Sequence, residues 1–143
     1  MEFEKSKLLY EENSKVAHTF WEWRHKIMNR FFVAVASIFI VSGWMLTNNQ
    51  FQECVFIPLL LGSIYSFISK RMDDVNTWIL RDCYKIGGEI EKEIANKESI
   101  FGLIDSGHYS KGNYAKILSI LYIASGIIMI VLSIISIFIY TIN

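Results

Sequence analysis

The most constraining feature of this sequence is its last long segment, from Ile117 to Ile142, which contains no charged residue. The hydrocarbon core of a bilayer is about 30 Å thick, and a helix of about 20 apolar residues crosses it. A helix also satisfies its own backbone hydrogen bonds inside lipid, which an irregular segment cannot do. The segment therefore predicts a membrane-spanning helix near the C-terminal end of the chain.

Two earlier apolar segments predict a helical hairpin in the same membrane. The first covers about residues 31–47 and the second about 51–69, with a short loop between them that contains no basic residue. The third span is expected over 114–142. We therefore expect an all-α integral membrane protein, a single unit over 1–143, with three transmembrane helices and two extensions. The extension at 1–30 is expected to be an amphipathic helix, and the extension at 70–113 is expected to be an amphipathic helix followed by a loop before the third span.

The basic residues indicate how the chain is oriented. All 14 Lys and Arg lie before the first predicted span or in the region from Lys70 to Lys116. Cytoplasmic segments carry the excess of Lys and Arg in membrane proteins. The pattern therefore predicts a cytoplasmic N-terminus, cytoplasmic extensions and a C-terminus outside.

Each extension carries an apolar stripe at helical spacing. The two stripes consist of Leu9, Val16, Phe20, Trp23 and Ile27 in the first extension, and Val75, Ile79, Cys83, Ile86, Ile90 and Ile94 in the second. Such stripes are buried against the other extension, against another copy of the chain, or against both. Within the second extension, Gly87-Gly88 predicts either a bend or a close helix contact. Pro58 predicts a kink in the second span.

Aromatic and basic side chains meet where the first extension enters the membrane. They are Trp23, Arg24, His25, Lys26 and Arg30. Indole rings at headgroup depth, with cations reaching outward, are typical of a membrane boundary. The same combination suits an anionic ligand such as a nucleotide. Further candidates for that ligand on the same side are Arg81, Lys85 and Lys111.

One face of the third predicted span is small, polar or soft. It consists of residues three and four apart: Ser119, Tyr122, Gly126, Met129, Ser133, Ser136 and Tyr140. We call this face the serine stripe. It predicts either helix contact within or between chains or a narrow, hydroxyl-lined pore. Glu53, near the outer end of the second span, is a further pore candidate at the mouth of a cation pathway, or else a residue that lies among headgroups.

Motifs of catalytic and cofactor sites are absent from the sequence. It contains no P-loop, HExxH, GxSxG or GxGxxG pattern. His18, Glu22 and His25 share a helical face, but two histidines and one carboxylate make an incomplete metal shell. We therefore expect no enzymatic activity, no metal and no cofactor.

The hairpin, its entry WEWRHKIMNRFF and the exit helix KRMDDVNTWILRDCYKIGGEIEKE resemble small bacterial membrane effectors of the SLATT type, over roughly residues 15–95. The resemblance implies a pore-forming effector of antiphage defence in the bacterial inner membrane. It also implies a homo-oligomer, for which a tetramer is our working assumption, controlled by a nucleotide second messenger from a soluble partner enzyme. The third span is an addition to the two-span pattern. The competing hypothesis is a non-conducting membrane scaffold that recruits a soluble partner.

Overall fold

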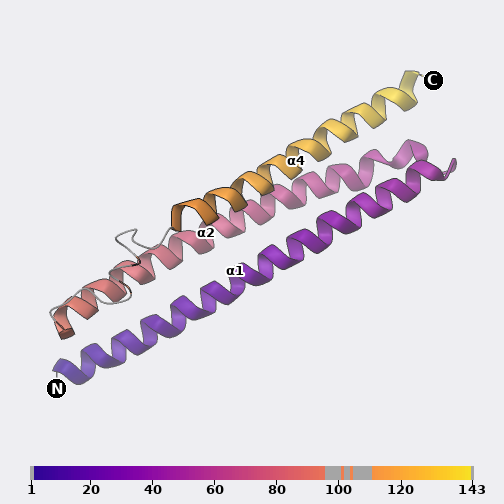
Figure 1. The fold of residues 1–143 in the computed structure, drawn as a ribbon. Helices are drawn as coiled ribbons and strands as arrows, with labels where there is room; N and C mark the ends of the chain where they lie inside the picture. Colours follow the sequence, from indigo (N-terminus) through magenta and orange to yellow (C-terminus); the bar gives the residue numbers. More distant parts are fainter. Residues whose placement is uncertain (1, 96–100, 102–103, 105–110, 143) are drawn as a thin grey trace. The chain divides into compact units, whose positions relative to one another are not determined.

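The computed structural model describes residues 2–95, 101, 104 and 111–142 and is almost entirely helical (Figure 1). The elements are α1 (Glu2–Thr47), the short 3₁₀ helix η1 (Gln52–Cys54), α2 (Phe56–Ala95) and α4 (Lys111–Ile142). Within the described residues, three helices are long and apolar enough to cross a membrane. The protein is therefore an all-α membrane protein, and this prediction from the sequence is confirmed. Most of the predicted loop before the third span, including Ile100 and His108, lies outside the described residues.

Two of the long helices join a predicted extension to a predicted span without a break. α1 runs through the expected boundary at residue 30, and α2 runs through the expected boundary at residue 70. α2 begins at Phe56, later than the predicted start, because η1 occupies the residues before it. Pro58 is consequently the third residue of α2, where backbone N–H groups have no intrahelical acceptor, so it interrupts no hydrogen bond of the helix.

The turn between α1 and α2 is held by short-range hydrogen bonds. The backbone N–H of Asn48 donates to the carbonyl of Met45 at 3.2 Å, and the N–H of Phe51 donates to the carbonyl of Asn48 at 2.9 Å. The side-chain amide of Gln52 donates to the carbonyl of Leu46 at 2.8 Å. These bonds satisfy carbonyls that the end of α1 would otherwise leave without a donor.

The contacts within the chain divide it into two compact units. The first contains Met1–Lys26 and Asp73–Ile117, and we call it the charged unit. The second contains Ile27–Met72 and Leu118–Asn143, and we call it the apolar unit. α1 and α2 both contribute to each unit, and the limits of the apolar unit lie close to those of the predicted spans.

Each unit has its own buried core. The core of the charged unit contains Ala17, Leu80, Cys83 and Phe101. The core of the apolar unit contains Phe31, Leu118 and Tyr122 in one cluster and Val55, Leu59 and Met129 in another. Glycine permits close packing in both units. A Cβ at Gly62 would lie 2.5 Å from Met129 Sδ, and a Cβ at Gly87 would lie 2.7 Å from the Phe101 ring. α2 continues as a helix through Gly87, so close contact explains this glycine and a bend is not needed.

Candidate functional site

The predicted pore face of α4 lies inside the apolar unit. Tyr122 and Met129 have no exposed surface, and Ser133 is 2% exposed. The Ser133 hydroxyl donates a hydrogen bond to the backbone carbonyl of Phe56 in α2, at 3.3 Å. The structure therefore places this part of the serine stripe against other helices of the same chain, which is one of the two arrangements predicted for it.

The remaining pore candidates divide into two groups. Gly126 and Ser136 are buried and Ser119 is half-buried, in line with the rest of the serine stripe. A Cβ at Gly126 would lie 3.2 Å from the ring of Phe67, so glycine allows α4 to approach α2 closely here. Glu53 is exposed within η1 and does not belong to this packed face.

Serine hydroxyls give the interior of the apolar unit a polar character. The buried serines are Ser42, Ser63, Ser66, Ser69, Ser133 and Ser136. Ser66 donates to the carbonyl of Gly62 in its own helix at 2.9 Å, which satisfies a hydroxyl without a partner helix. The hydroxyls of Ser42 and Ser136 have no hydrogen-bond partner among the described residues. Each unsatisfied buried hydroxyl of this kind costs about 1–3 kcal/mol.

The charged unit is built on a buried ion pair between α1 and α2. Arg24 Nε donates to Asp73 Oδ1 at 2.8 Å, and Arg24 Nη2 donates to Asp73 Oδ2 at 3.2 Å. The two side chains are only 9% and 3% exposed. A guanidinium that donates two parallel hydrogen bonds to a carboxylate uses the same N–H groups that would bind a phosphate. In this structure both of these donors of Arg24 bind Asp73, and its role as a ligand-binding residue stays a prediction.

Three more hydrogen bonds cross between the same two helices. They join the Asn76 amide to the Phe20 carbonyl at 3.4 Å, the Asn13 amide to the Cys83 carbonyl at 2.8 Å, and the Tyr10 hydroxyl to the Glu91 carboxylate at 3.1 Å. Residue numbers fall along α1 as they rise along α2, so all four contacts define one antiparallel register. We call this contact line the polar seam. Polar groups at such positions select one register, because any other register leaves them buried without partners.

Burial raises the pKa of two groups along the polar seam. Burial is the main cause that raises the pKa of Tyr10, and the hydrogen bond to Glu91 raises it further. Burial is also the main cause that raises the pKa of Cys83, and the negative charge of the nearby Asp82 carboxylate raises it further. Tyr10 therefore remains a hydrogen-bond donor at neutral pH, and Cys83 remains a thiol with the character of a buried structural residue.

The apolar stripe of α1 is displaced from the polar seam by one residue. Leu9, Val16 and Trp23 directly precede Tyr10, Ala17 and Arg24, and they are 47%, 43% and 54% exposed. On α2, Ile79 and Ile86 hold the equivalent places before Leu80 and Gly87. Ile79 is half-buried and Ile86 is 49% exposed.

These two stripes belong to the same side of the charged unit. Both helices are right-handed and they run in opposite directions, so the residues that precede the seam on each helix lie on one flank. We call this side, which contains Leu9, Val16, Trp23, Val75, Ile79 and Ile86, the apolar flank. The hairpin thus buries the polar seam beside its apolar core and leaves most of the apolar flank exposed.

The other ligand candidates are exposed and lie on different parts of the chain. His25, Lys26, Arg81 and Lys85 belong to the charged unit, and Arg30 belongs to the apolar unit. Lys26 lies 3.8 Å from Glu22 in an exposed ion pair. The side chain of Lys111 lies outside the described part of the chain. Among the side chains that the structure describes, the predicted cations are thus divided between the two units, and a joint ligand site stays a prediction.

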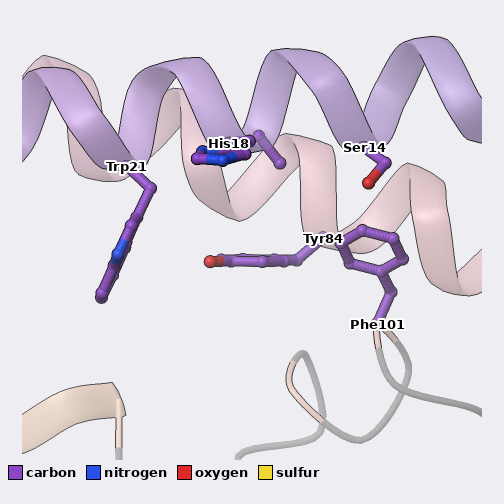
Figure 2. Close-up of a pocket in the computed structure, with 6 residues that line it drawn as sticks. Ser14, His18, Trp21, Tyr84 and Phe101 are labelled. Atoms are coloured by element: carbon purple, nitrogen blue, oxygen red, sulfur yellow. The ribbon is translucent and has the colours of Figure 1, made fainter.

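An open pocket occupies the second flank of the charged unit, on the side of the residues that follow the seam (Figure 2). Its volume is about 310 Å³, and it is lined by Ser14, Ala17, His18, Trp21, Tyr84 and Phe101. The rings of Tyr84 and Phe101 lie 5.8 Å apart, and the Phe101 ring also contacts Tyr10 edge-on at 5.5 Å. The backbone N–H of Phe101 donates to Glu91 Oε2 at 3.0 Å, which fixes this residue beside α2.

Aromatic rings make up most of the lining of the pocket. Burial raises the pKa of Tyr84, and the Arg24 cation partly opposes that rise. The phenol is therefore uncharged at neutral pH. Together with one hydroxyl from Ser14, the rings favour a flat and largely uncharged group over a metal or a compact anion.

Sequence reasoning missed both the polar seam and the pocket. A signal for the ion pair exists, because Arg24 and Asp73 stand at similar distances from the predicted membrane ends of their helices. No local signal brings Phe101 next to Tyr84, since that contact depends on how the chain returns after α2. Comparison of the chain with protein-family models, with curated proteins and with solved structures found no match.

Proposed function

We propose that the chain is a homo-oligomeric membrane effector whose assembled copies surround a pore. The observation that carries the proposal is the exposed apolar flank of the charged unit. A two-helix hairpin that buries Arg24 and Asp73 while exposing Val16 and Ile86 has not covered its apolar residues. Covering them with the same flank of a second copy would produce a helical bundle, and the seven-residue spacing of Leu9, Val16 and Trp23 suits such packing.

A second exposed line on α1 supports assembly within the apolar unit. Asn29, Ala36 and Gly43 are exposed at seven-residue spacing, and a Cβ at Gly43 would meet nothing within 4 Å. Small residues allow several copies of this helix to converge on a shared axis, and a face turned toward that axis lines the space that remains between the copies. Because the serine stripe of α4 is packed internally, we propose this face of α1 as the pore lining.

The orientation and the biological role follow from the sequence pattern. The concentration of all Lys and Arg on one side supports a cytoplasmic charged unit and an outside C-terminus in the bacterial inner membrane. The resemblance of residues 15–95 to SLATT-type effectors supports a role in antiphage defence. It also supports control by a nucleotide messenger that a soluble partner enzyme produces.

Ion flux from liposomes that contain the purified protein tests the pore. We expect flux through the wild-type protein after addition of an activating nucleotide, and a strong reduction in Gly43→Leu, which fills the proposed lining. The matched control is Val41→Leu, an exposed position on the opposite side of the same helix. Equal flux in both variants would overturn the proposed lining, and a wild-type protein that never conducts would overturn the pore.

A non-conducting scaffold is the second candidate function. The burial of Tyr122, Met129 and Ser133 within one chain favours it, because these residues were the best pore candidates in the sequence. In a scaffold, the apolar flank would bind a soluble partner. The flank substitution Val16→Glu would then abolish recruitment of that partner and leave the oligomeric state in detergent unchanged. In a pore-forming oligomer, the same substitution would dissociate the copies.

A further inference from the structure

We propose that the aromatic pocket of the charged unit binds the base of a purine nucleotide. The proposal deepens the proposed function, on which its biological meaning rests, but binding itself is measured without any conductance. The lining rings come from α1, from α2 and from Phe101 (Figure 2). A ligand in the pocket would therefore contact both helices of the hairpin and Phe101.

The chemistry of the lining selects a flat ring. His18 and Trp21 extend from α1 and Tyr84 from α2, and they surround one open space with Phe101 (Figure 2). Every nucleobase has a face that stacks on such rings, with about 1–3 kcal/mol per stacked base. The Ser14 hydroxyl adds one donor and acceptor for a ring nitrogen or exocyclic group at the edge of the base.

The size of the pocket leaves the rest of the nucleotide outside. A volume of about 310 Å³ is at the lower end of the range for small-molecule sites. It accommodates a two-ring base, and the sugar and phosphate would then lie at its open side. A phosphate in that position needs a cation close to the pocket.

Arg81 supplies that cation. It lies one helical turn before Tyr84 on α2, and residues three apart on a helix are neighbours on its surface. Its side chain is exposed, and within the described residues it forms no ion pair. The guanidinium is therefore available for two parallel hydrogen bonds to a phosphate, unlike that of Arg24.

Titration of the full-length protein in nanodiscs with three probes tests the proposal. The probes are AMP, adenosine (the base without the phosphate) and ribose 5-phosphate (the phosphate without the base). We expect saturable binding of AMP, binding of adenosine that is about tenfold weaker because one charge-assisted contact is lost, and no saturable binding of ribose 5-phosphate. Calorimetry measures all three, and quenching of indole fluorescence on stacking gives a second readout.

Substitutions identify the pocket as the place of binding. Trp21→Ala should weaken AMP binding at least tenfold, and Trp21→Phe should retain most of it because a ring remains. The matched control is Trp78→Ala, which removes a 65% exposed indole that does not line the pocket. Arg81→Ala, at an exposed position that puts folding at little risk, should weaken AMP about tenfold and leave adenosine unchanged.

Three results would overturn the proposal. They are no saturable AMP binding at millimolar concentration, ribose 5-phosphate binding as tightly as AMP, and equal losses in Trp21→Ala and Trp78→Ala. The second result would indicate a purely electrostatic site. A protein that binds AMP as described but never conducts would refute the pore and leave the nucleotide site intact.

Discussion

Removal of Asp73 tests the physical basis of the charged unit. In Asp73→Ala, the Arg24 guanidinium keeps its buried position and loses two hydrogen bonds, of 2.8 and 3.2 Å, to a carboxylate. Its side chain is only 9% exposed, so water replaces the lost partner poorly. Breaking one side of a buried ion pair costs about 3–5 kcal/mol. We expect the charged unit of this variant to be destabilised by that amount.

The matched control is an exposed ion pair on the same helix. Lys26 and Glu22 are 3.8 Å apart, with side chains 63% and 54% exposed. An exposed pair of this kind contributes less than about 1 kcal/mol. Glu22→Ala should therefore have little effect, although it removes the same type of charge as Asp73→Ala.

Hydrogen exchange of the α1 backbone amides, with the protein in nanodiscs, measures the opening of this unit without unfolding the membrane spans. A loss of about 3–5 kcal/mol corresponds to exchange that is faster by roughly two to four orders of magnitude. The double variant Arg24→Leu with Asp73→Leu should recover most of the protection, because apolar residues of similar volume replace a buried pair at little cost. Acceleration below about tenfold in Asp73→Ala, or equal acceleration in Glu22→Ala, would refute the reasoning.

Three further predictions concern the seam and the packing of the spans. The pKa of Tyr10 is raised, so its contribution to stability is complete below the pKa of an unfolded tyrosine, about 10, and is lost as pH rises through the higher folded-state pKa. Tyr10→Phe should therefore show a weaker loss of amide protection as pH rises above about 10, and an unchanged alkaline profile would contradict the seam. Gly62→Ala places a Cβ 2.5 Å from Met129 Sδ and should lower stability in detergent by about 1–3 kcal/mol through overpacking. Gly43→Ala meets nothing within 4 Å and should leave the thermal unfolding of the isolated chain unchanged, so a larger loss in Gly43→Ala than in Gly62→Ala would show that the packing is misassigned.

The spans were predictable because their signal is local. A segment such as Ile117–Ile142 has only one stable form in lipid, whatever surrounds it, so its hydropathy determines both its existence and its helical conformation. The C-terminal ends of α1 at Thr47 and of α4 at Ile142 follow the same signal. The start of α2 did not, because the η1 turn depends on backbone hydrogen bonds that hydropathy does not report.

The packing faces were harder to predict than the helices. The apolar stripe containing Val16 shows that this side of α1 avoids water, but the stripe alone does not say which surface covers it. The contact within the chain combines a small apolar core around Ala17 with the polar pairs of Arg24 and Asn13, whose pairing requires both helices in one register. Burying either charged residue without its partner is costly. A sequence pattern considered along one helix at a time therefore does not predict that either residue is buried.

Disulfide cross-linking in membranes tests the central claim, that the apolar flank joins one copy of the chain to another. In a Cys54→Ser background, which removes the exposed native thiol, a cysteine replaces either Val16 on the flank or Glu11 on the opposite, exposed side of α1. The account predicts covalent dimers under mild oxidation for Val16→Cys and few or none for Glu11→Cys. Equal cross-linking at the two positions, or none at Val16→Cys, would contradict it.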